Sequence, residues 1–206
     1  MSEAVHPRAA LVRRGLRLNY LTLGYNSIEA MVSLAAGLVA GSVALVGFGV
    51  DSAIEVTASL AAQWRLRSDH RERREQAERI TRRIIGCLFV ALAAYVTADS
   101  AMTLWQREAP GPSLVGVGIL ILSVLVMPLL AREKRRVAQA LSSQALEAEA
   151  RQTSLCAYLS VIALAGVALN TLFGWWWADP VAALLMVPII TKEGVEGLRA
   201  SRCLCS

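Results

Sequence analysis

The sequence predicts an all-α membrane protein with six transmembrane helices and with both termini in the cytoplasm. Of its 206 residues, 55% are apolar and only 18% are charged, whereas soluble domains are about 25% charged. The mean hydropathy is +0.48. Apolar stretches of bilayer length recur along the chain, and basic residues collect in every second connection between them. This composition excludes a disordered chain, a small disulfide-built scaffold and a collagen-like repeat.

Five segments are long and apolar enough to cross a bilayer, which takes about 20 residues at a rise of ~1.5 Å each. They cover residues 18–40, 42–64, 84–105, 114–131 and 153–175. We expect these spans to form most of one transmembrane domain, residues 18–198, between short cytosolic tails at 1–17 and 199–206.

A sixth span is expected at residues 180–198, although only its outer half is apolar. Lys192 and Glu193 lie in its inner half, from which a lysine can reach the nearby interface. Its start is well marked, because Asp179 can cap the helix and Pro180 suits its first position.

Basic residues predict the orientation. Twenty of the 21 Lys and Arg residues fall in the N-terminal tail, the second and fourth connections and the C-terminal end, and Arg107 alone falls on the other side. By the positive-inside rule, the basic side faces the cytoplasm. A nucleic-acid interface would require basic residues interleaved with aromatic ones on one surface. The connections lack this pattern, so we expect no nucleic-acid partner.

Four acidic residues fall inside the predicted spans: Glu29, Asp51, Glu55 and Asp99. The first five spans contain no Lys or Arg to neutralise them, and a charge at the centre of a bilayer costs about 2.5–3.5 kcal/mol on insertion scales. Such an acid can stay protonated or bind a cation. An acid that does both in turn is suited to cation/proton exchange.

Asp51 and Glu55 form the strongest pair, because i, i+4 spacing places both carboxylates on one helix face. Asp51 lies nine residues from Ser42, or ~14 Å along the helix, near the middle of the membrane. A divalent cation would remove the repulsion between the two carboxylates. The alternative is a protonated acid bonded to a neighbouring helix. Glu29, in the middle of the first span, could join this site or hold the bundle together through a hydrogen bond.

The fifth span adds softer ligands. Gln152 and Cys156 are also four residues apart, and Cys156 is expected at the depth of Glu55, ~20 Å from the outer end. Carboxylates with a thiolate favour a zinc-like ion over magnesium or calcium. A buried cysteine can also be a small core hydrophobe. Glu149 could draw cations to the inner mouth, or it could be an ordinary solvated residue.

Four further residues are weaker metal candidates. Asp69 and His70 form either a minor site or a surface charge cluster, and Cys203 and Cys205 form a short C-x-C at the cytosolic end. Cys87 is expected in the core.

The chain lacks the H-E-x-x-H, G-x-S-x-G and P-loop motifs, so we expect no enzyme.

The pattern of spans and acids resembles the cation diffusion facilitator family. Residues 42–55 (SVALVGFGVDSAIE) look like its second-helix segment, with Asp51 and Glu55 at the two positions of the motif Asp/His-x-x-x-Asp. Residues 148–156 (AEARQTSLC) line up with its fifth-helix pattern Ala-Asp-x-x-His-x-x-x-Asp, with Gln152 and Cys156 at the last two ligand positions. The segment WWWADP at 175–180 is similar to the link into the sixth helix.

The resemblance implies a homodimer in the bilayer that exports Zn²⁺, or Cd²⁺, Co²⁺, Mn²⁺ or Fe²⁺, in exchange for protons held by Asp51 and Glu55. It implies no prosthetic group. The chain looks like a short, divergent member without the C-terminal cytosolic domain, similar to the synaptic-vesicle zinc-transporter-like branch. Nineteen Arg against two Lys suggest a GC-rich bacterial genome, so the expected location is a bacterial inner membrane. The alternatives are a metal-binding sensor or modulator that does not transport, and a carrier of another cation, such as an organic amine.

Overall fold

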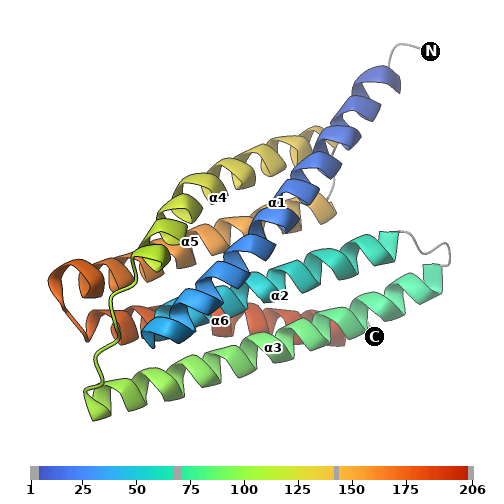
Figure 1. The fold of residues 1–206 in the computed structure, drawn as a ribbon. Coiled ribbons are helices and arrows are strands. Elements are labelled where there is room, and N and C mark those ends of the chain that lie inside the picture. Colours follow the sequence, from blue (N-terminus) through green and yellow to red (C-terminus); the bar gives the residue numbers. More distant parts are fainter. Residues whose placement is uncertain (1–4, 67–70, 142–143, 204–206) are drawn as a thin grey trace.

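The computed structural model describes residues 5–66, 71–141 and 144–203, and six long helices make up nearly all of them (Figure 1). The helices are α1 (Val5–Ala40), α2 (Val43–Leu66), α3 (Arg71–Gln106), α4 (Leu114–Leu141), α5 (Gln144–Phe173) and α6 (Ala178–Cys203). No strand occurs in these three ranges. The predicted all-α class is confirmed.

Five helices contain a segment that is long and apolar enough to cross a membrane. In the described part of the chain, these segments are Ala10–Ala40, Val43–Leu60, Arg83–Gln106, Leu114–Leu141 and Glu149–Phe173. The second half of α6 carries Lys192, Glu193 and Glu196, which lower its hydropathy. The sixth span at 180–198 therefore stays a prediction.

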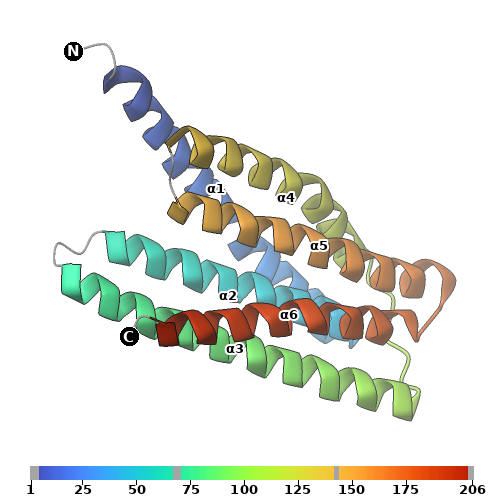
Figure 2. The ribbon, with the colours of Figure 1, turned by 180° about the vertical axis from the view of Figure 1, so that it is seen from behind.

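The helix ends are arranged as the predicted orientation in the membrane requires. The start of α1, the end of α6, and the ends that face the second and fourth connections all lie at one end of the bundle (Figures 1 and 2). The other three connections lie at the opposite end. α3 packs along α6, and α4 packs along α5. α2 contacts α1, α3, α5 and α6 and is the most deeply buried of the five apolar helices.

The end of the bundle that is predicted to face outward is tied together by Asp179. α1 ends in a tight turn at Gly41, where a φ of 65° suits glycine. The Ser42 hydroxyl donates a hydrogen bond of 2.5 Å to Asp179 Oδ2, and the Ala44 amide lies 3.4 Å from Asp179 Oδ1. Asp179 lies in the first turn of α6, but its carboxylate caps α2 and so links the two helices. The predicted local cap is thus a contact between two helices.

The outside of the bundle is apolar, as expected for contact with lipid. Val39 and Trp105 are 91% and 90% exposed, and monomeric soluble proteins rarely expose large contiguous apolar patches. The expectation that Cys87 belongs to the core is wrong, because its side chain is exposed on α3. Hydropathy indicates that this segment is apolar but does not say which of its faces packs inward.

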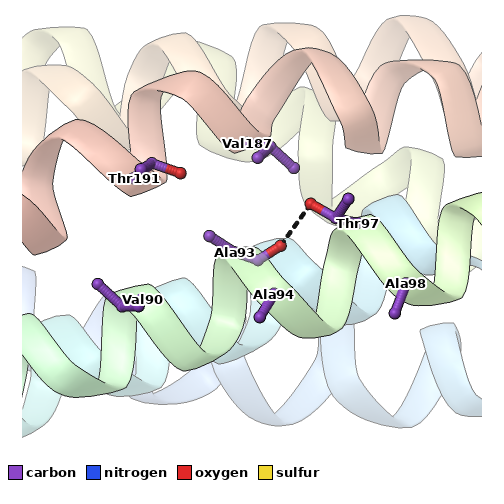
Figure 3. Close-up of a pocket in the computed structure, with 7 residues that line it drawn as sticks. All are labelled: Val90, Ala93, Ala94, Thr97, Ala98, Val187 and Thr191. Carbon is purple, nitrogen blue, oxygen red and sulfur yellow. Dashed lines mark hydrogen bonds between the residues drawn. The ribbon is translucent and has the colours of Figure 1, made fainter.

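A groove of about 410 Å³ runs between α3 and α6 (Figure 3). Seven small or β-branched residues line it: Val90, Ala93, Ala94, Thr97, Ala98, Val187 and Thr191. The Thr97 hydroxyl donates to the Ala93 carbonyl of its own helix at 2.7 Å. Because no acidic side chain lines this groove, it offers no ligand set for a cation.

The close packing of α5 against α6 leads to a stability prediction. A methyl group at Gly166 would meet Ala182 Cβ and would lie 2.9 Å from the Ala178 carbonyl oxygen, whereas a methyl group at Gly118 would meet nothing within 4 Å. Gly166→Ala should lower the free energy of unfolding by about 1–3 kcal/mol. Gly118→Ala is the matched control and should be neutral or stabilising by up to about 1 kcal/mol. Unfolding in detergent measures both, and equal effects would contradict the packing described for α5 and α6.

Candidate metal centre

α2 and α5 bring three predicted ligands together. Asp51 and Glu55 lie one turn apart on α2, and Cys156 lies on α5. One ligand atom from each lies within 4.8 Å of the other two. The three residues are 3%, 4% and 0% exposed. The spacing along α2 and the matched depth on α5 predicted this grouping.

Apolar packing keeps the site dry. Cys156 belongs to the main core cluster together with Phe48, Ile54 and Leu159. Asp51 and Glu55 are only 3% and 4% exposed beside this apolar cluster. An ionised group there gains little solvation, so it requires a nearby proton, hydrogen-bond donor or cation.

α1 supplies part of the surroundings of the site. The Asn26 amide donates a hydrogen bond of 2.7 Å to Glu55 Oε2. Glu29 is fully buried, accepts a 2.8 Å hydrogen bond from the Ser52 hydroxyl, and lies 3.8 Å from Cys156 Sγ through its Oε2. Glu29 therefore borders the three-residue cluster through Cys156, in a position compatible with either of its predicted roles.

Two buried oxygens around the cluster, Glu55 Oε1 and Asn26 Oδ1, have no hydrogen-bond partner among the described residues. The hydroxyl groups of Tyr25 and Ser123 lie close to Glu29 and can act as its donors. Buried polar atoms are nearly always satisfied in folded proteins. A proton or a bound cation at the cluster would satisfy the remaining oxygen of Glu55.

The donor set fits a transition metal better than a hard cation. Zinc bonds of 2.0–2.3 Å place tetrahedral ligand atoms about 3.3–3.7 Å apart, so side-chain shifts of about 1 Å would close the cluster around an ion. Calcium takes six to eight oxygen ligands and magnesium requires an octahedron of oxygens. One sulfur and a few carboxylate oxygens do not meet either requirement.

The remaining predicted residues lie away from the cluster or outside the described part. Gln152 is half-buried one turn before Cys156. Glu149 is half-buried two turns before Cys156 and pairs with a lysine of α4. Asp69, His70 and Cys205 lie outside the described residues, and so does the side chain of Cys203 at the end of α6. Asp99, the fourth of the acids predicted to lie inside a span, accepts a 3.0 Å hydrogen bond from Tyr95 of its own helix.

The sequence prediction missed Lys134. It ended the fourth span at residue 131 and counted Lys134 among the cytosolic charges, whereas α4 continues to Leu141 and buries Lys134 to 2% exposure. Helical periodicity carried the signal, because Met127, Ala131, Lys134 and Ala138 continue one buried stripe.

The thiol in the cluster leads to a spectroscopic prediction. Cadmium binds thiolates strongly, so cadmium added to a variant with Cys203 and Cys205 changed to Ser should produce a thiolate-to-metal charge-transfer band. Cys156→Ser in that background should abolish the band, and Cys87→Ser should leave it intact. Ultraviolet difference spectroscopy measures it, and a band that survives Cys156→Ser would exclude the thiol as a ligand.

The chain is similar to known transporter proteins. A family model described as the cation efflux transmembrane domain matches residues 20–202. The chain is 26% identical over 192 residues to the uncharacterized transporter YdbO of Bacillus subtilis, which covers 90% of this chain and 66% of that protein. It is 23% identical over 171 residues to the uncharacterized transporter sll1263 of Synechocystis sp., which covers 80% of this chain and 55% of that protein.

The chain thus spans about two thirds of the length of the first relative and somewhat more than half of the second. Members of the matched family are transporters and not enzymes, in agreement with the prediction of no enzyme. The predicted resemblance is confirmed by a match over most of the chain. This integral membrane protein belongs to the cation efflux family.

Proposed function

We propose that the protein exports a divalent transition-metal cation, most simply Zn²⁺, in exchange for protons. One observation carries the proposal: two carboxylates and a thiol, all buried in a membrane bundle, bring ligand atoms within 4.8 Å of one another. Isolated ionisable groups are expensive at this depth and by default mark an ion pathway. The family match supports a cation as cargo.

Asp51, Glu55 and Cys156 form the proposed ion site. Glu29 is the best candidate for a fourth ligand, because it is fully buried and its Oε2 lies 3.8 Å from Cys156 Sγ. Gln152 is a poor ligand for a transition metal, since its amide oxygen is neutral. Its proposed role is to hold water or to orient a ligand.

Proton exchange follows from the same carboxylates. Asp51 and Glu55 can each hold a proton or part of the charge of a cation, so protons from the outer side would release the ion. Transporters commonly expose a central site to one side and then the other by rocking helices against one another. The proposed assembly is the homodimer that the family resemblance implies. The proposed location is a bacterial inner membrane, in keeping with bacterial relatives that are named transporters.

Loss of Asp51 tests transport. Asp51→Ala removes one ligand and one proton carrier, so zinc-driven proton flux in liposomes should fall to the rate of protein-free vesicles. Asp99→Asn is the matched control, because Asp99 is half-buried and bonded within its own helix; its flux should stay within about twofold of wild type.

Unchanged flux in Asp51→Ala would contradict the proposal. Zinc binding without flux in the wild-type protein would favour the sensor, a role in keeping with Gln152 at a ligand position. Displacement of zinc by organic amines, and not by cadmium or manganese, would favour a carrier of another cation.

The dependence of binding on pH tests proton coupling. Metal ligands must lose their protons to bind. Zinc affinity should therefore be highest at high pH and should fall as the pH is lowered, because the carboxylates and the thiol then become protonated. Calorimetry in buffers of different ionisation enthalpy should record proton release on binding, and Glu55→Gln should release fewer protons. Affinity that does not change with pH would exclude direct exchange.

A further inference from the structure

The buried face of α1 is polar along much of its length. Polar residues recur there every three or four positions, at Asn19, Thr22, Asn26, Glu29 and Ser33. Each of them is at most 8% exposed, and we call them the polar stripe of α1. The exposed side of the same segment carries apolar residues, including Leu21, Ile28 and Met31. This part of α1 is therefore polar toward the bundle and apolar toward its outside.

The oxygens of the stripe are acceptors that lack donors. Asn19 Oδ1 and Asn26 Oδ1 have no hydrogen-bond partner among the described residues. The Thr22 hydroxyl donates its hydrogen to the Leu18 carbonyl of its own helix at 2.9 Å, so its oxygen keeps acceptor lone pairs. Polar side chains that hold membrane helices together do so by hydrogen bonds between helices. Oxygens without such bonds are instead suited to a cation.

The stripe leads from the predicted cytosolic end of the bundle to the metal centre. Asn26 donates to Glu55, and Glu29 lies 3.8 Å from Cys156. Asn19 lies seven residues before Asn26, which is ~10.5 Å nearer the cytosolic end. Thr22 lies between these two asparagines. Two oxygens of the stripe thus lie between the cytosolic end of the bundle and the site.

α1 and α2 are packed most closely on the outer side of the site. A methyl group at Gly37 would lie 2.8 Å from Val46. A methyl group at Gly49 would lie 2.9 Å from Leu34. On the cytosolic side, residues 56–60 of α2 are half-buried or exposed, and the N-terminal half of α1 diverges from α2 (Figures 1 and 2). Access to the site is therefore favoured from the cytosolic side.

The lysine buried on α4 near the start of the stripe is paired. A methyl group at Gly15, one turn before Asn19, would lie 3.5 Å from Val137 of α4. Lys134 lies about one turn from Val137 along α4, nearer the site, and its ammonium group is 3.8 Å from Glu149. Because the carboxylate balances this charge, Lys134 does not by itself repel an approaching cation.

We propose that the polar stripe of α1 is the route along which a divalent cation reaches the metal centre from the cytosolic end. This inference rests on the proposed function. The oxygens of Asn19, Thr22 and Asn26 replace water around the ion in turn. They are neutral and therefore hold a transition metal only weakly, as conduction requires. The ion then passes to the carboxylates and the thiol, which hold it more strongly.

The rate of cadmium binding to the full chain in lipid nanodiscs tests the route. In the protein with Cys203 and Cys205 changed to Ser, stopped-flow mixing with Cd²⁺ records the appearance of the Cys156 thiolate band. Asn19→Leu combined with Thr22→Val removes two oxygens at nearly constant volume. Binding should become about tenfold slower or more, since each lost contact with a charged group raises the barrier. The dissociation constant should stay within about threefold, because neither residue touches the bound ion.

Two matched variants separate the route from packing and from direction. Asn19→Gln keeps the amide oxygen and should bind cadmium within about threefold of the unchanged rate. Ser33→Ala removes a buried oxygen that also lacks a hydrogen-bond partner among the described residues. Ser33 lies beyond Glu29, on the outer side of the site, so this variant should bind at the unchanged rate.

Three results would overturn the inference. The first is an unchanged rate in the double variant, and the second is equal slowing in Asn19→Gln or Ser33→Ala. The third is a dissociation constant that weakens as much as the rate falls, which would make Asn19 or Thr22 a ligand of the bound ion. Failure of the proposed function has a different signature, since the thiolate band would then be absent before any residue of the stripe is changed.

Discussion

This structure depends on one constraint: its buried acidic groups are removed from water and need other partners. Glu29, Asp51 and Glu55 are at most 4% exposed, and an isolated ion at such a position would be strongly disfavoured. The bundle supplies neutral donors, Asn26 and Ser52, to two of these acids. It also buries the ammonium group of Lys134 beside Glu149 and Thr153 of α5. Glu55 Oε1 keeps no hydrogen-bond partner among the described residues, and a proton or a metal ion can meet this remaining demand.

A buried positive charge lies on the predicted cytosolic side of Cys156. Lys134 of α4 is 2% exposed and lies 3.8 Å from Glu149 Oε2 and 3.4 Å from Thr153 Oγ1, so its contacts in the described part of the chain are with α5. The groove between α3 and α6 lacks acidic residues and offers no second set of ligands for a cation.

Much of the fold and the centre of the site could be predicted from the sequence, because both depend on regular helix geometry. A rise of ~1.5 Å per residue placed Cys156 at the depth of Glu55, and i, i+4 spacing paired Asp51 with Glu55. The exposure of Cys87 and the burial of Lys134 were not predicted, because hydropathy describes a segment and not its faces. The contact of Asp179 with Ser42 joins residues 137 positions apart, beyond the reach of local patterns.

Anomalous scattering at the zinc absorption edge, from crystals of the full chain grown with zinc, tests the metal centre most directly. We expect one peak within bonding distance of Asp51, Glu55 and Cys156, and no peak there in crystals of Asp51→Ala. A zinc peak elsewhere in the bundle, with these three side chains free of metal, would contradict the assignment of the ion site.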